Sequence, residues 1–269
     1  MPRMTNEPFF RTLHEGHYLP TAASRGPWDP GSLHGRVVAG LLAHEIERRH
    51  GDAAFLPARL TVDLYRLPDF SPARVTTSVV RGGHRIKVVD AEYLCGGVSM
   101  ARASCQMLRR TENPEGNVWR PPSWNVPPPE EVSVPEGWGG GLGGMWAMRP
   151  ITGAAFGAVP GVVVQKRAWL SEVRELVERV PLSPWVRVAL AADFASPFAN
   201  SGDHGLGYIN TDITLYLNRL PMDEWIGFEV ANHQATEGVA LGACSLYDRE
   251  GPIGAATVTA LAQRRMKRG

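Results

Sequence analysis

The sequence contains few cysteines and no metal-binding pattern. Its 269 residues include only three cysteines, Cys95, Cys105 and Cys244, which are widely spaced and lie in apolar segments without a CxxC pair or a neighbouring histidine array. An odd, scattered set of this kind argues against a disulfide framework and a structural zinc site, and is typical of a reducing compartment. We therefore expect no metal centre and a cytoplasmic protein.

An excess of charge of one sign is also missing. The chain has 28 basic and 27 acidic residues, a formal net charge of +1, so no overall field attracts nucleic acid or a membrane surface. Glu7, Arg11 and His14 interrupt the segment where a signal peptide needs an apolar stretch, and no apolar run approaches about 18 residues. The basic run at 264–268 is typical of a solvated end. These features predict no nucleic-acid partner, no membrane insertion and a small ligand.

Motifs for nucleophilic or nucleotide chemistry are absent as well. The sequence contains no Gly-x-Ser-x-Gly and no phosphate loop of the Walker type. The glycine run from Gly139 to Gly144 follows no predicted strand and opens no suitable helix. We interpret this run as part of a linker.

A change of composition divides the chain into two halves. Residues 111–150 carry clustered prolines and then glycines, which predicts a linker between an N-terminal domain at 1–110 and a C-terminal domain at 151–269. Exposed tryptophans are costly, so we expect the linker to lie pinned on a domain surface by Trp119, Trp124, Trp138 and Trp146.

The two halves resemble each other, which predicts a repeated fold. The run Tyr65 to Pro68 (YRLP) returns as Asn218 to Pro221 (NRLP), at an offset of 153, because 219 minus 66 is 153. A second landmark matches Gly97 with Gly251, at an offset of 154, because 251 minus 97 is 154. The two offsets are nearly the same, so both landmarks point to one duplication.

Each half shows one apolar helix followed by strand-like segments. Apolar residues at helical spacing predict a helix at 33–49, and a second helix is predicted near 183–195. Val-, Thr- and Tyr-rich segments bounded by turn residues predict antiparallel strands at 58–66, 73–81, 85–94 and 98–109, and at 211–219, 225–233, 238–247 and 253–263. An additional strand is expected before each helix, at 15–22 in the first half, and residues 248–251 predict a hairpin turn. The fold class is α+β, with a curved meander wrapped around each helix.

Three segments carry a resemblance to a known family. They are Trp28 to Gly35 (WDPGSLHG), Tyr208 to Thr214 (YINTDIT) and Leu217 to Pro221 (LNRLP). Together they resemble the TesB-like double hot-dog acyl-CoA thioesterases. The resemblance implies two tandem hot-dog domains that form one extended curved sheet around two central helices. It also implies acyl-CoA as substrate, no cofactor, and a chain that can associate further into a homodimer or higher oligomer.

The resemblance also implies a set of site residues around one water. The family uses an Asp on the second helix, a Ser, Thr or Asn on the next strand, and a Gln on the last strand. Asp193 matches the first, and it interrupts an apolar stretch where an unpaired carboxylate costs several kcal/mol. Asn210 matches the second, with Thr211 beside it on the opposite strand face. The Gln position falls on Val258 or Thr259, so the set is incomplete and Thr259 is the polar candidate there.

The substrate-binding residues are expected at the start of the first helix. Backbone N–H groups at a helix N-terminus favour developing negative charge, and Gly35 there allows a thioester carbonyl to approach closely. His34 and Arg36 flank it, and we expect all three residues to contact the substrate.

Two other functions are compatible with the sequence. Asp29 and His34 are five residues apart, as in hot-dog enoyl-CoA hydratases, but the intervening residues lack the Asn-Pro of that signature. The missing Gln is also compatible with a non-catalytic protein that binds acyl-CoA or an acyl chain. Thioester hydrolysis, slow because of the missing Gln, is the favoured function.

Overall fold

A computed structural model describes residues 7–134, 146–152 and 160–263. Trp138, the glycine run from Gly139 to Gly144 and the basic run at 264–268 lie outside the described residues. No helix in the described part is both long and apolar enough to span a membrane.

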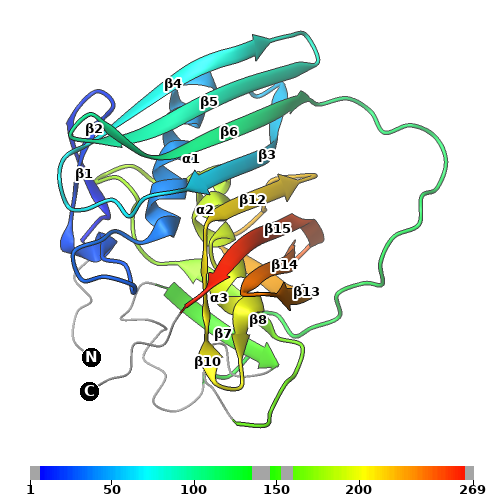
Figure 1. The fold of residues 1–269 in the computed structure, drawn as a ribbon. Coiled ribbons are helices and arrows are strands. Elements are labelled where there is room, and N and C mark those ends of the chain that lie inside the picture. The colour runs from blue at the N-terminus through cyan, green and yellow to red at the C-terminus, as the bar shows by residue number, and fades with distance from the viewer. Residues whose placement is uncertain (1–6, 135–145, 153–159, 264–269) are drawn as a thin grey trace, which may run out of the picture.

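The structure is a long antiparallel sheet that wraps two central helices (Figure 1). The first half contains β1 (Phe10–His14), β2 (His17–Pro20), α1 (Gly35–His50), β3 (Phe55–Leu64), β4 (Ala73–Gly82), β5 (Ile86–Cys95) and β6 (Val98–Arg109). The second half contains β7 (Trp146–Thr152), β8 (Arg167–Glu172), α2 (Pro184–Ala192), α3 (Ala195–Asn200), β9 (Ser201–Gly202), β10 (Gly205–Leu206), β11 (Tyr208–Asn210), β12 (Asp212–Leu217), β13 (Trp225–Thr236), β14 (Val239–Asp248) and β15 (Gly251–Ala262).

The strand order repeats on either side of a central seam. The sheet runs β1-β2-β4-β5-β6-β3-β12-β15-β14-β13-β8-β7, and β11 also pairs with β15. Read outward from the seam, β3-β6-β5-β4 matches β12-β15-β14-β13. This order confirms the predicted duplication and the double hot-dog architecture.

One offset relates the two halves throughout the sheet. Adding 153 to the bounds of β5 (86–95) and β6 (98–109) gives the bounds of β14 (239–248) and β15 (251–262). The offset of 154 predicted from Gly97 and Gly251 is therefore wrong by one residue, and Gly251 corresponds to Val98. Matching glycine with glycine gave the wrong offset, because the two hairpins have their glycines at different positions. In the β5–β6 hairpin the two loop residues are Gly96 and Gly97, with φ of 56° and 80°. In the β14–β15 hairpin the two loop residues are Arg249 and Glu250, and Gly251 is the first residue of β15.

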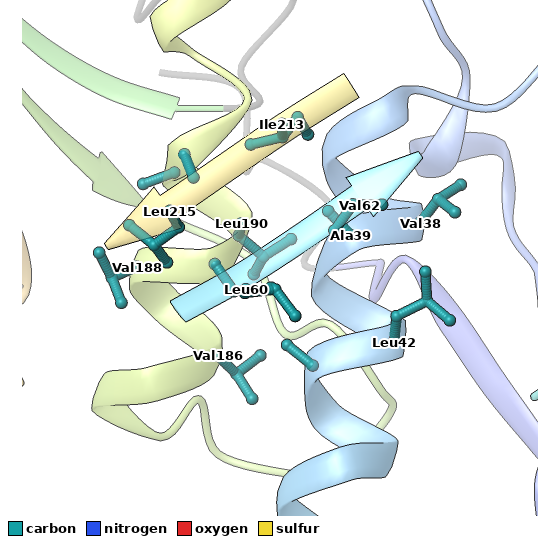
Figure 2. Packing of buried hydrophobic residues seen from close by; sticks show 14 of the residues in the cluster. Val38, Ala39, Leu42, Leu60, Val62, Val186, Val188, Leu190, Ile213 and Leu215 are labelled. Carbon is teal, nitrogen blue, oxygen red and sulfur yellow. The ribbon is translucent and has the colours of Figure 1, made fainter. Parts of the chain in front are cut away.

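The seam itself has internal twofold character. β3 pairs with β12 in antiparallel register, and Thr61 lies opposite Thr214, which is its own counterpart because 214 minus 61 is 153. Their Oγ1 atoms are 3.3 Å apart. Figure 2 shows how this arrangement repeats in the core: Leu60 and Val62 from β3, and Ile213 and Leu215 from β12, face α1 and α2. The helices therefore lie side by side under the seam.

Several elements differ from those predicted. The second helix is broken after Ala192, and α3 begins at Ala195, so Asp193 stands at a break between two helices. The strand expected at 211–219 is the shorter β12 at 212–217, and Thr211 separates it from a further short strand, β11 at 208–210, that was not expected. The hairpin turn at 248–251 is confirmed. β1, β7 and β8 lacked a clear alternation in the sequence, and they form the two ends of the sheet.

Two tryptophans of the segment between the halves are packed against the protein: Trp146, which is 3% exposed in β7, and Trp124. The Trp124 ring stacks on Tyr247, with ring centroids 4.3 Å apart, and its Nε1 donates to Glu229 Oε2 at 3.2 Å. Trp169 Nε1 donates to the Pro127 carbonyl at 2.9 Å. Trp119, in contrast, is 83% exposed. The chain after β6 thus crosses the outer face of the second half, where Trp124 holds it. The division at residues 110 and 150 stays a prediction.

Candidate active site

The candidate site is centred on Asp193, which joins the two halves of the molecule. Asp193 is the C-cap residue of α2 and is only 4% exposed. Asn210, at the end of β11, donates from Nδ2 to Asp193 Oδ1 at 2.9 Å. His34, the N-cap residue of α1, places Nδ1 3.2 Å from Asp193 Oδ2. The predicted contact between Asp193 and Asn210 is therefore present, and His34 adds a partner from the first half.

The hydrogen bond between His34 and Asp193 defines the His34 tautomer. Nδ1 also lies 3.3 Å from the backbone nitrogen of Arg36, whose N–H points at it. One nitrogen cannot accept this N–H and donate to the carboxylate at the same time. A lone pair facing a buried carboxylate is repelled, so we assign the proton to Nδ1, where it is donated to Asp193.

The surroundings of Asp193 keep its carboxyl group ionised. Burial by itself raises the pKa of Asp193, because the charged form loses water. The hydrogen bond and charge of His34, the amide of Asn210 and the charge of Arg36 act in the opposite sense and outweigh burial. The pKa of Asp193 is therefore below its ordinary value, so a deprotonated carboxylate is available at neutral pH.

Gly35 brings the start of α1 close to this carboxylate. A Cβ atom at Gly35 would lie 3.5 Å from both Asp193 carboxylate oxygens and 3.0 Å from Leu64 Cδ1. The first amides of a helix have no partner within the helix and point outward. Of these, the Val37 amide donates to the His34 carbonyl at 3.1 Å. The absence of a side chain at Gly35 thus leaves space between the first turn of α1 and the carboxylate.

A cavity of about 180 Å³ opens onto these groups. Its polar lining includes Asp193, Asn210 and Thr211, and its apolar lining includes Trp28, Leu33, Val38, Leu64 and Leu67. The cavity therefore combines a few convergent polar atoms with an apolar wall, which is the usual composition of a small-molecule site. Both halves of the chain contribute to it.

Thr211 and Thr259 lie together, but they do not bond Asp193. Their Oγ1 atoms are 3.1 Å apart, and the Thr259 backbone nitrogen donates to Asp212 Oδ1 at 2.6 Å. Thr259 is exposed and Val258 beside it is 1% exposed, so alternation along β15 turns Thr259 away from the core. The structure thus brings Asp193, Asn210, His34 and Gly35 together, and it places Thr259 on the opposite face of the sheet.

The inward residues of β15 are apolar at the point where the resemblance implies a Gln. Val258 and Ala260 are each 1% exposed, and Ala260 lies directly opposite Asn210 in the β11–β15 pairing. Residues opposite each other on paired strands share one face of the sheet. Ala260 is therefore the β15 residue whose side chain is next to Asn210, and it has no polar group.

Arg36 lies behind the site and is fully buried. Its Nη1 donates to the Glu172 carboxylate of β8, and its guanidinium carbon lies 3.8 Å from the centroid of the Trp146 ring and 4.7 Å from that of Phe9. Burial lowers the pKa of Arg36, and the charge of Glu172 acts in the opposite sense. Burial raises the pKa of Glu172, and the charge of Arg36 acts in the opposite sense. An arginine stays protonated under such conditions, so we treat the contact as an ion pair. Arg36 does not line the cavity; it braces α1 against the second half.

The spacing between Asp29 and His34 does not produce a contact between their side chains. Asp29 is exposed, and its Oδ1 accepts from the Gly31 backbone nitrogen at 2.7 Å, so it forms a turn before α1. His34 faces Asp193 instead. The hydratase-like pair is therefore not assembled. Among the described residues, no three His, Cys, Asp or Glu side chains gather in a way that would hold a metal ion.

The contact between His34 and Asp193 was not predicted from the sequence. The available signal was its position as an N-cap residue before an apolar helix, but an N-cap histidine shows nothing about a partner on another helix. Glu172 likewise gave no signal, because it is the last residue of β8, and the sequence did not locate the strand expected before the second helix.

Comparisons with known proteins place both halves of the chain in one family. A model of the acyl-CoA thioesterase N-terminal domain matches residues 24–108, and one of the acyl-CoA thioesterase C-terminal domain matches residues 125–262. A comparison with curated proteins finds no match.

Solved structures are similar over nearly the whole chain. A tesB protein from Mycobacterium avium subs paratuberculosis is 13% identical, with 95% of this chain and 96% of that chain covered and a TM-score of 0.68. An acyl-CoA thioesterase II from Mycobacterium marinum is 15% identical, with 96% of each chain covered and a TM-score of 0.65. A hot-dog protein of unknown function from Alicyclobacillus acidocaldarius is 16% identical, with 93% of each chain covered and a TM-score of 0.71. These likenesses show the double hot-dog fold, and since the two domain models together match both halves, the chain belongs to the acyl-CoA thioesterase family.

Proposed function

We propose that this protein hydrolyses the thioester of a fatty acyl-CoA with a water held between Asp193, Asn210 and the start of α1. The observation that carries this proposal is a buried, ionised carboxylate that receives two hydrogen bonds and faces an apolar cavity at a helix N-terminus. Thioester hydrolysis needs a base for water and a donor for the oxyanion, and this arrangement supplies both.

Each group has a separate part in the reaction. The Asp193 carboxylate accepts a proton from the water, whose oxygen bonds to the thioester carbon. The Gly35 N–H and the N-terminal end of the α1 dipole stabilise the negative charge on the carbonyl oxygen. When the C–S bond breaks, its electron pair leaves with the CoA sulfur, which takes up the proton held by Asp193.

Two neighbours hold the carboxylate in place. His34 donates from Nδ1 to Oδ2, and Asn210 donates from Nδ2 to Oδ1 and, at 3.4 Å, to the Asp212 carbonyl. The Asn210 Oδ1 atom then accepts from the water. Because Ala260 supplies no further polar group beside Asn210, we expect turnover on the order of 10² to 10³ below that of a site with one more positioned donor.

Thiol release from acyl-CoA tests the proposal. A panel of acyl-CoAs of increasing chain length should show steady-state CoA release by the parent protein. Asp193→Asn should lower kcat by on the order of 10² to 10⁴, because the base is lost. Asp212→Asn is the matched control. The Asp212 carboxylate bonds Thr259, and only its backbone carbonyl, which the substitution keeps, accepts from Asn210, so the rate of this variant should remain close to that of the parent. Tight binding without release by the parent would instead identify an acyl-CoA-binding protein.

A further inference from the structure

A second cavity lies at the opposite end of the helix pair. Its volume is about 340 Å³, and its apolar lining includes Phe55, Pro57, Met107, Trp185 and Leu220. We propose that this cavity is a second acyl-binding pocket, related to the first by the internal twofold, which holds an acyl amphiphile without hydrolysing it.

The duplication relates the two cavities residue by residue. With the offset of 153 established for the sheet, Pro57 corresponds to Asn210 and Leu67 corresponds to Leu220. Leu67 and Asn210 line the first cavity, and Leu220 and Pro57 line the second. A pocket built from the counterparts of an active site has inherited its shape from the same fold.

A carboxylate meets a helix N-cap at both sites. At the first, the α1 N-cap His34 faces Asp193 near the end of α2. At the second, the α2 N-cap Ser183 donates from Oγ to Glu47 Oε2 at 2.6 Å, and Glu47 lies in the last turn of α1. Glu47 also lines the second cavity. The polar centre of the site is therefore duplicated in a changed form.

The changes remove the means of activating water. Pro57 stands where the first site has Asn210, and its side chain has no hydrogen-bond donor. Burial raises the pKa of Glu47, which the Ser183 hydrogen bond opposes but does not overcome. This shift is opposite to that of Asp193, but the decisive difference is geometric: Pro57 supplies no amide to hold a water beside the Glu47 carboxyl group. We therefore expect binding at this pocket and no hydrolysis.

The rim of the second cavity indicates an anionic head group. Arg110 lines the cavity. Lys87 and Arg109 approach Phe55, with Nζ 4.2 Å and Cζ 4.7 Å from the ring centroid. Asp52 pairs with Lys87 at 2.6 Å, and Arg109 and Arg110 are two further cationic side chains near the cavity. An apolar wall beside two guanidinium groups suits an acyl compound with an anionic group, either the phosphates of the CoA part of an acyl-CoA or the carboxylate of a free fatty acid.

Binding stoichiometry tests this inference. The experiment uses calorimetric titration with S-dodecyl-CoA, a thioether that cannot be hydrolysed, and a parallel titration with dodecanoate. We expect two equivalents of one of these probes per chain in the parent. Leu220→Trp should fill the second cavity and leave one equivalent, while thiol release at the first site stays within about twofold. Leu67→Trp, its counterpart, should leave one equivalent and abolish thiol release.

A surface substitution keeps the inference testable should Leu220→Trp fail to fold. Arg110 is exposed, and Arg110→Glu should weaken the second binding event at least tenfold without changing the first. The two probes distinguish the possible head groups. If Arg110→Glu loses the second binding event only in the S-dodecyl-CoA titration, the pocket recognises CoA phosphates. If it loses the second binding event in the dodecanoate titration, the pocket recognises the free acid. A single equivalent of each probe in the parent, or two in Leu220→Trp, would overturn the inference.

The inference rests on the proposed function only for the class of ligand. If the parent releases no thiol but binds two equivalents, the proposed hydrolysis fails and the second pocket stands. If it releases thiol and binds one equivalent, the second pocket fails and the proposed hydrolysis stands.

Discussion

Restoring a polar side chain beside Asn210 is expected to raise turnover. The change is Ala260→Gln, because Ala260 lies opposite Asn210 on the inner face of β15. Opposed side chains on paired strands have Cβ atoms about 4.5 to 5.5 Å apart, within reach of a Gln amide. One additional positioned donor is worth on the order of 10² to 10³ in kcat, so we expect an increase toward that limit.

The same change has a cost in stability. Ala260 is 1% exposed, so a longer side chain overpacks the core at about 1 to 3 kcal/mol, and any amide hydrogen left unpaired adds about 1 to 3 kcal/mol. The two costs add up to about 2 to 6 kcal/mol, which a domain stability near the middle of the usual range of about 5 to 15 kcal/mol tolerates. Urea denaturation should therefore show a lower midpoint for Ala260→Gln but a folded protein in water.

Two neighbouring substitutions serve as controls. Val258→Gln points inward but lies two residues, about 6.6 Å, further along β15, and should destabilise the protein without raising the rate. Thr259→Gln points outward and should change neither property much. The assay is steady-state thiol release from acyl-CoA for all three variants. If Thr259→Gln raises kcat and folded Ala260→Gln does not, the assignment of the inner face is refuted.

Three further perturbations have defined outcomes. Gly35→Ala places a methyl group 3.5 Å from the Asp193 oxygens. It should lower kcat/KM in thiol-release assays by on the order of 10², with little loss of stability. An unchanged kcat/KM would show that the substrate does not approach Gly35. The pKa of Asp193 is lowered in the folded protein, so the carboxylate stabilises the fold at neutral pH and this contribution is lost as pH falls below about 4. The unfolding free energy of the parent, compared with that of Asp193→Asn, should therefore fall only below about pH 4. A fall that begins near pH 6 would contradict this expectation. Trp124→Ala should destabilise the protein by about 2 kcal/mol in urea denaturation, whereas Trp119→Ala, at an 83% exposed position, should have no effect, and equal effects would mean that Trp124 is not an anchor.

Much of the fold was predictable because its signals are local. Alternating apolar residues and glycine turns defined β3 to β6 and β12 to β15 within a few residues, and the repeated YRLP and NRLP segments revealed the duplication. The weaker elements were missed for a local reason as well. β1, β7 and β8 form the two ends of the sheet, and their short sequences lack regular alternation.

The candidate site was predictable only in part. Asp193 was identified because it matches the Asp that the family resemblance implies. Its apolar neighbours in sequence add that such a carboxylate must have partners. The identity of those partners cannot. His34 reaches Asp193 because α1 and α2 pack side by side under the seam, which no local pattern specifies.

The direction of each side chain at the site was decided by tertiary structure. Alternation predicts that Asn210 and Thr211 face opposite sides, but which side is inward depends on the break at Thr211, whose N–H donates to the Thr259 carbonyl at 3.0 Å. That break shifts the pairing with β15, so Ala260, and neither Val258 nor Thr259, comes to lie beside Asn210. The sequence by itself thus determined the repeated sheet and the position of one buried carboxylate. The inward faces and the contacts between halves depended on strand register and helix packing, which form only when distant segments meet.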